Sequence, residues 1–278
     1  MSRSGTLYLV ATPIGNLGDI TKRAIEILSN CPVIVTEDTR TTGNLLNYLG
    51  IEGKKLISFY EGKEEKEIPH ILSLLRRGID IALVSEAGSP VISDPGYLLV
   101  KECIKEDVKV TCAPGPSAPI ASLMISGIEP IPFTFLGFLP RRQGEIKNLF
   151  YSFLNIKTTL IFFERKSRLK NTLKLAFDVF GGEREVAIVR ELTKLYEEVI
   201  RFPLYEYNKL NEVKGEITVI ISPPKKDIKT DVSYVKKIIE QKIGSGLTGK
   251  DIIKEVMDEV IGWNKKEIYD LFLRIKNG

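Results

Sequence analysis

The stretch VATPIGNLGDIT (Val10–Thr21) joins a run of apolar residues to two glycines, a proline and an acidic residue. It ends a predicted strand over 6–12 and leads into a helical pattern over 19–30, for which Asp19 is the expected N-cap. Glycine lets the backbone approach another group closely, and proline fixes the shape of a loop. A strand, a backbone-rich loop and a helix in this order predict an α/β fold with a binding site at the end of a strand.

Length and composition set the scale of the fold. The chain has 278 residues, of which 43% are hydrophobic and 27% charged, and its formal net charge is +4. A typical domain has about 100–200 residues, so we expect two domains and a smaller appendage in a globular protein with a substantial core. The apolar run near the N-terminus is too short for a signal peptide or a membrane span, and we expect a cytoplasmic protein.

Predicted strands and helices alternate along the chain. Strands over 6–12, 32–38, 55–61, 80–86 and 108–115 are separated by helical patterns. Such alternation predicts a largely parallel sheet with helices on both faces. A second series of strands and helices follows, and it is long enough to form a sheet of its own.

These patterns divide the chain into four regions. We predict an N-terminal α/β domain over 1–114, a second α/β domain over 115–222, a linker over 223–231 and a C-terminal helical module over 232–278. The linker contains two prolines and five charges, which cannot join a core. The last region has the pattern of three short amphipathic helices.

Four loops rich in glycine, proline and polar residues follow predicted strands of the first sheet, and the last of them leads into the second series of strands and helices. They are TPIGNLGD (12–19), EDTRTTGN (37–44), SEAGSPVISDPG (85–96) and APGPSA (113–118). Each loop alone is typical of a tight turn. Because ligands of open α/β sheets bind outside the carboxyl ends of the strands, the four loops together predict a preformed pocket that holds its ligand largely through backbone groups.

Two nucleotide-binding motifs are incomplete. Residues 15–18 (Gly-Asn-Leu-Gly) do not supply the G-x-G-x-x-G pattern of dinucleotide-binding folds. GSGLTGKD (244–251) has Asp251 where a P-loop needs a Ser or Thr to hold magnesium, and no strand precedes it. Nucleotide triphosphate binding is therefore disfavoured.

Metal-binding chemistry has little support in the sequence. His70 is the single histidine, and the cysteines lack the spacing of metal ligands. We expect no metal site, and we expect reduced thiols in the core at all three cysteines: Cys31, Cys103 and Cys112.

Seven motifs occur in the order and spacing of a known family. They are LYLVATPIGNLGDITKRAIEIL, TEDTRTTGNLL, VSEAGSPVISDPG, APGPSAPIASLMISG, FLGFLP, RELTKLYEE and KGEITVII. Over about residues 5–222 the chain closely resembles the ribosomal RNA small-subunit methyltransferase I family, the 16S rRNA (cytidine-2'-O)-methyltransferases, a branch of the tetrapyrrole methylase superfamily. The resemblance implies two α/β domains with a cleft for the methyl donor S-adenosylmethionine between them, and a homodimer. It also implies that the acceptor is a cytidine ribose in the decoding (P-site) region of 16S rRNA in the small ribosomal subunit.

The resemblance further implies which residues contact the donor. Carried over position by position, they are Gly88, Ser89, Pro90, Ile92, Ser117, Ala118, Phe163, Leu192 and Ile217, with Pro13 and Gly15 lining the same cleft. The chain departs from the family at two places. Glu86 and Ser89 stand where the family usually has Asp and Thr, and Lys166 and Ser167 stand where it commonly has Pro and His. Because Ser167 replaces that histidine, this chain lacks any contact that the histidine makes in the family.

Methylation of a ribose 2'-hydroxyl requires an acceptor for one proton. A sulfonium methyl group is already activated, so in-line positioning can contribute about 7–11 kcal/mol. A nearby carboxylate or lysine can accept the proton of the weakly acidic hydroxyl. The candidates in the predicted loops are Glu37, Asp38, Glu86 and Asp94. The alternative role of each is helix capping or loop hydrogen bonding.

Basic residues indicate where RNA would bind. Arg40 follows the EDT motif, and Arg141 and Arg142 follow FLGFLP, so each could contact phosphate or be solvated surface. Residues 223–278 contain 12 Lys or Arg against 9 Asp or Glu, which places three of the four net positive charges in the tail. A basic tail favours phosphate binding, and a charged solubilising bundle is the alternative.

Three functions stay open at this point. The first is an RNA 2'-O-methyltransferase, the second a related methyltransferase for a tetrapyrrole or a protein side chain, and the third a non-enzymatic RNA-binding relative. The lysine-rich tail and the EDTRTTGN loop favour the first over the second, and the four intact loops disfavour the third.

The chain is also rich in apolar residues at positions expected to lie in loops. Together with the resemblance, they suggest the interface of a symmetric dimer: Phe133, Phe135, Leu136 and Phe138.

Overall fold

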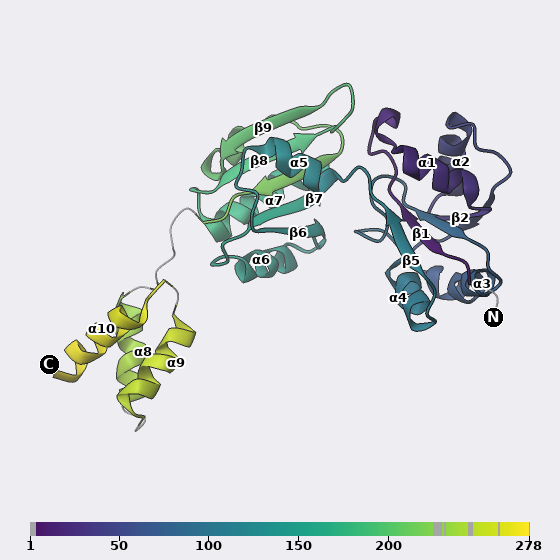
Figure 1. Cartoon of the computed structure of the whole chain (residues 1–278). Coiled ribbons are helices and arrows are strands. Elements are labelled where there is room, and N and C mark those ends of the chain that lie inside the picture. The colour runs from purple at the N-terminus through teal and green to yellow at the C-terminus, as the bar shows by residue number, and fades with distance from the viewer. Residues whose placement is uncertain (1–3, 225–229, 231, 244–246, 261, 278) are drawn as a thin grey trace.

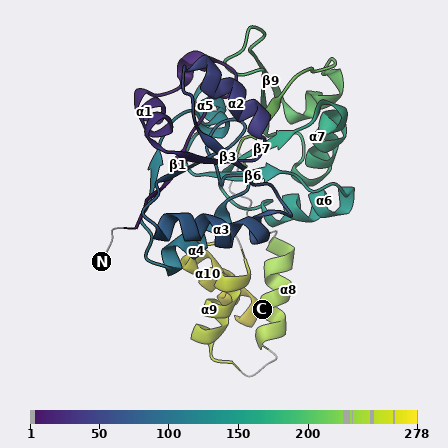
Figure 2. The ribbon, with the colours of Figure 1, turned by 90° about the vertical axis from the view of Figure 1, so that its right-hand side faces the viewer.

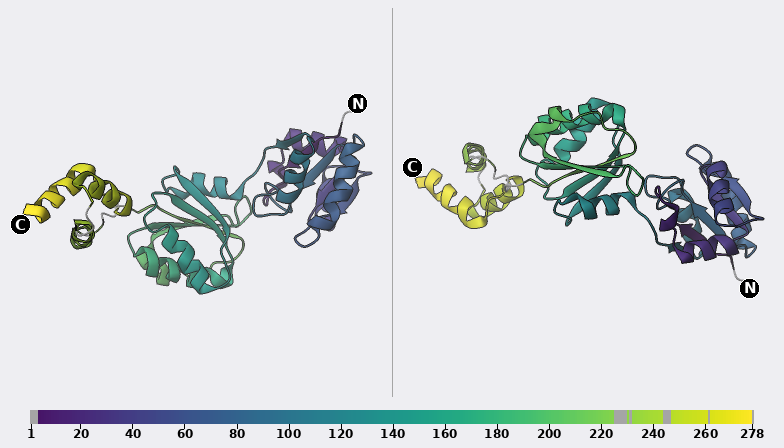
Figure 3. Two further views of the ribbon diagram at one scale, coloured as in Figure 1. Left: turned by 90° about the horizontal axis from the view of Figure 1, so that it is seen from below. Right: turned by 90° about the horizontal axis from the view of Figure 1, so that it is seen from above.

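The structure is a computed structural model that describes residues 4–224, 230, 232–243, 247–260 and 262–277. Figure 1 shows two α/β parts in chain order, followed by a group of helices at the C-terminal end. In both views of Figure 3 the second α/β part lies between the first part and the terminal helices. The predicted linker falls largely outside the described residues, as do residues 244–246 of the incomplete P-loop pattern.

The first sheet is parallel throughout. Its strand order is β3-β2-β4-β1-β5, with every neighbouring pair parallel. The strands are β1 (Leu7–Val10), β2 (Val33–Thr36), β3 (Lys55–Ser58), β4 (Ile81–Val84) and β5 (Val110–Ala113). The predicted parallel sheet is confirmed, with each strand inside its predicted range.

Helices cover both faces of this sheet, as predicted. They are α1 (Lys22–Asn30), α2 (Thr39–Tyr48), α3 (Glu64–Arg76) and α4 (Tyr97–Lys105). Figure 2 shows α1 and α2 on one side of the strands and α3 and α4 on the other. Leu28 and Leu46 belong to one core cluster, and Ile71 and Leu99 belong to the cluster on the opposite face. Burial of apolar side chains on both faces explains the near-continuous apolar strands.

The first helix begins later than predicted. A short 3-10 turn (η1, Leu17–Asp19) follows β1, because the Asn16 side chain accepts a hydrogen bond from the Gly18 N–H. Ile20 is extended, and Thr21 caps α1 by accepting a hydrogen bond from the Ala24 N–H. The expected capping role of Asp19 is therefore wrong, since an extended residue separates it from the helix.

The second sheet is mixed. Its order is β6-β7-β10-β8-β9, in which β6 and β7 are parallel and the other pairs antiparallel. The strands are β6 (Phe133–Phe138), β7 (Thr159–Glu164), β8 (Glu185–Arg190), β9 (Glu198–Pro203) and β10 (Ile217–Ile221). This confirms that the second part of the chain forms a separate sheet.

Helices also cover both faces of the second sheet. They are α5 (Ala118–Ser126), α6 (Gln143–Ser152), α7 (Lys166–Phe180) and the 3-10 helix η2 (Leu204–Lys209). Leu123 of α5 packs with Ile161 and Ile220 on one face. Phe150 of α6 and Leu173 of α7 belong to the larger core on the other face. Each sheet therefore has its own core.

The C-terminal helices form a small third core. They are α8 (Val232–Ile243), α9 (Gly249–Glu259) and α10 (Lys265–Asn277). Val235, Ile253, Val256 and Ile268 are buried between them. The prediction of three amphipathic helices in this region is confirmed. Within the described part of the chain, none of the helices combines the length and apolar character needed to cross a membrane.

Two of the three cysteines lie in the core. Cys31 and Cys103 are buried, and burial raises the pKa of each thiol to about 11. Cys112 is exposed, so the expectation of a core position is wrong for this residue. It lies on β5, an edge strand of the first sheet with a neighbouring strand on one side only.

Candidate functional site

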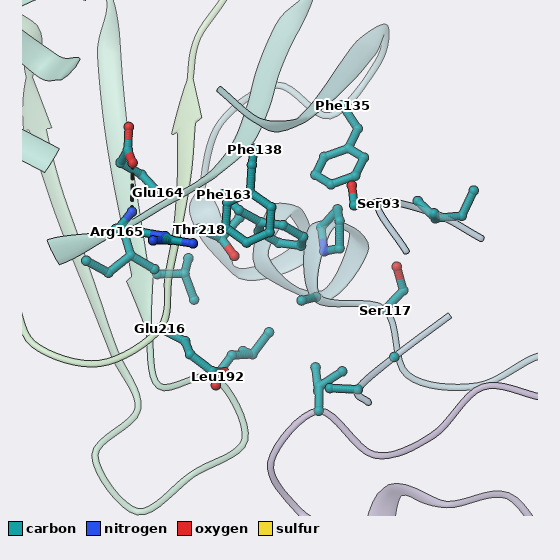
Figure 4. A pocket seen from close by; sticks show the side chains of 18 of the residues that line it. Ser93, Ser117, Phe135, Phe138, Phe163, Glu164, Arg165, Leu192, Glu216 and Thr218 are labelled. Carbon is teal, nitrogen blue, oxygen red and sulfur yellow. Dashed lines mark hydrogen bonds between the residues drawn. The ribbon is translucent and has the colours of Figure 1, made fainter. Parts of the chain in front are cut away.

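A cavity of about 680 Å³ lies between the two α/β parts. One wall comes from loops of the first sheet, the other from the ends of β6, β7, β8 and β10, and residues 117–119 join the two walls. Figure 4 shows Ser93 and Ser117 on one side of the cavity and Phe163, Glu164 and Leu192 on the other. Sites for small molecules typically measure about 300–1,000 Å³, so the cavity is large enough for a cofactor-sized ligand.

Two loops of the first wall are joined by a short antiparallel bridge. The Thr12 N–H donates to the Gly88 carbonyl at 2.9 Å, and the Gly88 N–H donates back to the Thr12 carbonyl at 3.0 Å. The φ of Gly88 is +80°, and a Cβ there would lie 3.2 Å from Cγ2 of Ile14. Glycine is favoured in this left-handed, crowded position. The bridge fixes the backbone of the wall before any ligand binds.

The opposite wall carries a group of aromatic rings. The ring centre of Phe163 lies 5.1 Å from that of Phe135 and 5.3 Å from that of Phe138. The register of β6 shifts between Phe135 and Phe138, where Gly137 has a φ of +63°. This bulge brings both rings to Phe163. The rings are tilted against one another and form an apolar, aromatic wall that a heterocyclic ring can pack against, a role that the sequence analysis did not give to Phe135 or Phe138.

Carboxylates gather at the rim of the first wall. The pKa of Asp94 is raised to about 6, first by burial and then by the charges of Glu37 and Glu86. The pKa of Glu37 is also raised, by burial and then by Glu86 and Asp38. Asp94 and Glu86 line the cavity, whereas Glu37 is outside its lining. Among the described residues, no group of three or more His, Cys, Asp or Glu side chains is arranged to hold a metal ion.

Asp38 has a different environment from the other carboxylates. It is the N-cap of α2, and its Oδ1 accepts hydrogen bonds from the N–H groups of Arg40 at 2.7 Å and Thr41 at 3.4 Å. The Arg40 N–H is the main cause of its lowered pKa. A lowered pKa makes Asp38 a weak base, and the geometry gives it the capping role that was the alternative interpretation.

Most residues implied as donor contacts line the cavity. They are Gly88, Ser89, Ile92, Ser117, Ala118, Phe163, Leu192 and Ile217. Pro90 is buried next to this wall. Pro13 lines a second hollow instead, and Gly15 faces Thr193 and Lys194 of the second part. Ile14, which lies between them in the sequence, does line the cavity.

The sequence analysis missed a polar network beside the aromatic rings. Glu164, buried at the end of β7, accepts hydrogen bonds from Thr172 Oγ1 at 2.6 Å and from the Arg165 N–H at 2.7 Å. Arg168 lies 3.4 Å from Glu164 and donates to the Pro140 carbonyl at 2.5 Å. The network fixes the start of α7 against the loop after β6. A charged residue at the end of an apolar strand was the available signal.

A second, smaller hollow adjoins the cavity. It measures about 230 Å³ and lies between the loop after β1, the helix α2 and residues 85–86. Its lining includes Pro13, Leu17, Asn44, Tyr48 and Glu86. Glu86 lines both hollows, so the two spaces share this residue as part of their walls.

The predicted RNA contacts lie at helix starts outside the cavity lining. The Arg40 side chain is 85% exposed and pairs with Asp38 at 3.3 Å. Arg142 is the N-cap residue of α6 and pairs with Glu145 at 3.4 Å, and Arg141 precedes it. Solvent-exposed pairs of this kind are weak, so these side chains are free to exchange their partners for phosphate.

Comparisons with known proteins agree with this architecture. Residues 6–208 match the tetrapyrrole (corrin/porphyrin) methylase family. The structure resembles uroporphyrin III C-methyltransferase from Thermus thermophilus, with a TM-score of 0.54, 18% identity, and coverage of 78% of this chain and 97% of that one. It also resembles the methyltransferase CobJ, with a TM-score of 0.59, 15% identity, and coverage of 82% and 97%. At these identities the likeness concerns the fold alone.

Sequence relatives are much closer. The chain is 41% identical over 276 residues to "Ribosomal RNA small subunit methyltransferase I" of Streptococcus pyogenes serotype M3 (strain ATCC BAA-595 / MGAS315), covering 97% of this chain and 95% of the relative. A protein of the same name from Rickettsia prowazekii (strain Madrid E) is 40% identical over 269 residues, with 95% of each chain covered. One from Hydrogenobaculum sp. (strain Y04AAS1) is 46% identical over 222 residues, covering 78% of this chain and 95% of the relative.

Proposed function

Because the chain belongs to the ribosomal RNA small subunit methyltransferase I family within the tetrapyrrole methylases, we propose that it transfers a methyl group from S-adenosylmethionine to the ribose 2'-oxygen of a cytidine in 16S rRNA. The small ribosomal subunit, in its decoding region, is then the substrate. This substrate places the reaction in the cytoplasm.

The observation that carries the proposal is the composition of the main cavity. An aromatic wall around Phe163 faces a glycine-rich backbone wall at Gly88, and a half-buried carboxylate, Asp94, lies at the rim. The donor has an adenine ring, a polar ribose and an amino-acid end, which need an apolar surface and backbone hydrogen-bonding groups. When bound, S-adenosylmethionine supplies an activated methyl group. The residues present therefore fit this donor.

Two kinds of surface in the cavity would hold the donor. Phe163, Leu192 and Ile217 offer the apolar surface, and the backbone around Gly88 and Ser117 offers N–H and carbonyl groups. A wall fixed before binding restricts the donor to one orientation, and orientation is the main requirement of this transfer.

Asp94 is the residue that we assign to proton transfer. The new bond forms at the 2'-oxygen while its O–H bond breaks, and the proton passes to a carboxylate oxygen. A carboxylate whose pKa is raised to about 6 is a stronger base than an ordinary Asp and is still largely ionised at neutral pH. Glu37 lies outside the cavity lining and Asp38 is occupied as a helix cap. Glu86 also lines the cavity but is exposed.

A second candidate function is methylation of a tetrapyrrole or a protein side chain. The name of uroporphyrin III C-methyltransferase suggests a tetrapyrrole, but the identity of that structural neighbour to this chain is 18%. Relatives at 40–41% identity over nearly the whole chain carry an rRNA name. The intact cavity with its raised-pKa carboxylate disfavours a non-enzymatic RNA-binding role.

The proposal includes a homodimer. Ile120 and Met124 lie one helical turn apart on α5 and are both exposed, and Ile131 is exposed shortly after this helix. Exposed apolar side chains at this spacing suit an isologous interface. Light scattering on the intact chain should give twice its 31.2 kDa mass, and Met124→Asp should lower that value. A monomer at micromolar concentration would contradict the assembly.

Methyl transfer to small ribosomal subunits tests the activity. Subunits that lack the modification are incubated with the protein and S-adenosylmethionine carrying a labelled methyl group, and the modified nucleotide is mapped by mass spectrometry. We expect one labelled 2'-O-methylcytidine in 16S rRNA. Label in a tetrapyrrole or ribosomal protein, but not in RNA, would support the second candidate.

A further inference from the structure

The loop that carries Asp94 has an unusual backbone. Val91 has a φ of +76° and Ser93 a φ of +67°. Such left-handed values are uncommon outside glycine, and for a β-branched residue such as valine they are a genuine outlier. Asp94 itself precedes Pro95, which restricts its backbone to extended conformations. Because strained conformations persist only where the surrounding structure holds them, contacts of this loop must keep Asp94 in place.

One of these contacts is at Gly96, where the loop ends. Gly96 is buried with a φ of +128°, and a Cβ there would lie 2.7 Å from Cδ2 of Leu83 and 3.1 Å from Cγ2 of Val91. The Gly96 N–H donates to Oε1 of Glu64 at 2.7 Å. A buried N–H that lacks an acceptor is costly, so the Glu64 carboxylate stabilises this end of the loop.

Glu64 belongs to an element that is fixed by the core. It is the first residue of α3, and Ile68 and Ile71 of the same helix are buried in one cluster with Leu83 of β4. Glu64 and Gly96 are 32 residues apart in the sequence. The hydrogen bond between them therefore ties the Asp94 loop to a different, firmly packed helix.

The middle of the loop meets the second α/β part. A Cβ on Gly137 would lie 2.9 Å from Oγ of Ser93, and Gly137 belongs to the bulge of β6 beside the aromatic rings. Ser93 and Asp94 both line the cavity. Asp94 thus lies between a contact with the opposite wall on one side and the anchored Gly96 on the other.

We infer that Glu64 is a positioning residue, which holds the Asp94 carboxylate at the cavity by accepting the hydrogen bond of the Gly96 N–H. This role rests on the proposed function, in which Asp94 accepts the proton of the ribose 2'-hydroxyl. Glu64 is outside the cavity lining, so it acts through the loop and not on the substrate. Proton transfer needs the acceptor within about 2.6–3.2 Å, and a misplacement of about 1 Å can cost about 10²-fold in rate.

The alternative role of Glu64 is to stabilise the start of α3. Glu64, Glu65 and Glu67 are all acidic residues of its first turn, where negative charge is favourable. Two substitutions separate the roles. Glu64→Gln keeps an acceptor oxygen but removes the charge, whereas Glu64→Asp keeps the charge but withdraws the acceptor by one methylene group. Glu65→Ala is the matched control, because Glu65 is an exposed residue of the same turn.

Methyl transfer to small ribosomal subunits gives kcat and KM for each variant, and calorimetry gives the donor affinity. We expect Glu64→Ala and Glu64→Asp to lower kcat about 10²-fold while the donor affinity is kept, because the proton acceptor is displaced and the main donor surfaces are not. Glu64→Gln and Glu65→Ala should match the wild type, since both keep the hydrogen bond to the loop.

The pH dependence provides a second readout. The pKa of Asp94 is raised from 3.8 to about 6 by burial and then by the charges of Glu37 and Glu86. A released loop exposes Asp94 to water, so the midpoint of kcat/KM should move from about 6 toward 3.8 in Glu64→Ala. A simple loss of folded protein would lower the rate at every pH and leave the midpoint unchanged.

Two further measurements connect Glu64 to Asp94. In the Asp94→Asn background, Glu64→Ala should cause no further loss of kcat, because a residue that acts through Asp94 has nothing left to position. Hydrogen exchange of residues 91–96, followed by mass spectrometry, should be faster in Glu64→Ala and Glu64→Asp than in the wild type. This readout does not depend on methyl transfer.

Three results would overturn the inference. The first is a wild-type kcat and pH midpoint in both Glu64→Ala and Glu64→Asp. The second is a loss of the same size when Glu64→Ala is added to Asp94→Asn, and the third is a Glu64→Gln variant as slow as Glu64→Ala. A wild type that methylates no RNA would instead remove the proposed function, and the role of Glu64 in proton transfer with it, while hydrogen exchange would still report whether Glu64 anchors the loop.

Discussion

Lys194 of the second α/β part lies against Gly15 of the first. A Cβ on Gly15 would be 2.7 Å from Cγ of Lys194 and 2.9 Å from Oγ1 of Thr193, and Gly15 has a φ of +153°. The Nζ of Lys194 is held by Glu191 at 3.3 Å and Glu216 at 3.0 Å. The two parts therefore meet at a glycine beside the donor cavity, where an added side chain would force Lys194 and Thr193 to shift.

Gly15→Ala should weaken donor binding about tenfold, because the added methyl group strains the backbone and pushes the loop carrying Lys194 away from the first wall. Isothermal calorimetry with S-adenosylmethionine measures the change. Gly144→Ala is the control, since an added Cβ there meets no atom within 4 Å. Equal affinity of the Gly15 variant and the wild type would show that the contact does not shape the cavity.

The proton-transfer role of Asp94 predicts a pH dependence. With a pKa of about 6, Asp94 is protonated at low pH and cannot accept a proton, so kcat/KM for subunits should fall as pH decreases through 6. Asp94→Asn should lower turnover about 10²–10⁴-fold and remove this dependence, with donor affinity kept. A rate profile that is flat between pH 5 and 8 in the wild type would assign the role elsewhere.

The same carboxyl group predicts a change in stability. Burial and the charges of Glu37 and Glu86 raise the pKa of Asp94 in the folded state above 3.8, its ordinary value. Folding then favours the neutral form, and the stability from this group is present below pH 3.8 and lost as pH rises through 6. Asp94→Asn should therefore raise the thermal midpoint at pH 8 but not at pH 4. A lower midpoint at pH 8 would contradict the burial of the charge.

The network at Glu164 should stabilise the second part. Glu164→Ala leaves the buried Thr172 hydroxyl without its acceptor and removes the carboxylate partner of Arg168. We expect a loss of about 1–3 kcal/mol in the free energy of unfolding, measured by urea denaturation. Glu145→Ala breaks an exposed pair with Arg142 and should change stability by less than about 0.5 kcal/mol. Equal effects of the two variants would contradict the importance of burial.

The terminal helices should contribute to RNA binding. Because the cavity is lined by residues between Ile14 and Thr218, a chain that ends at residue 222 should still fold and bind S-adenosylmethionine. Its RNA affinity should fall, and the slope of log affinity against log salt should become shallower by about 0.7–0.9 for each lost phosphate contact. Filter binding over a salt series measures both. An unchanged slope would leave α8–α10 with a purely structural role.

Local sequence was sufficient to predict the strands and helices. Continuous apolar runs such as Ile81–Val84 and the four-residue spacing of Ala24 and Leu28 depend only on near neighbours. The glycine-rich loops were predictable for the same reason, because Gly88 and its neighbours follow β4 directly. Boundaries were less certain, since the Asn16 side chain and the extended Ile20 delay the start of α1.

Contacts between distant segments could not be predicted in this way. The aromatic wall depends on a bulge in β6 that brings Phe135 and Phe138 to Phe163. The raised pKa of Asp94 depends first on burial and then on the charge of Glu37, which is far away in sequence. These features arise from tertiary packing, and no periodicity in the chain reports them.

The two walls of the cavity belong to α/β parts with separate cores, and this arrangement has a thermodynamic consequence. A ligand that contacts both walls binds only when the two α/β parts are docked, so its binding free energy is shared by both folding units. At a donor concentration 100 times its dissociation constant, this linkage adds about 2.7 kcal/mol to the docked state. Two melting steps in the free protein should then merge into one cooperative transition in the donor complex, which makes cellular S-adenosylmethionine a determinant of the lifetime of the folded enzyme.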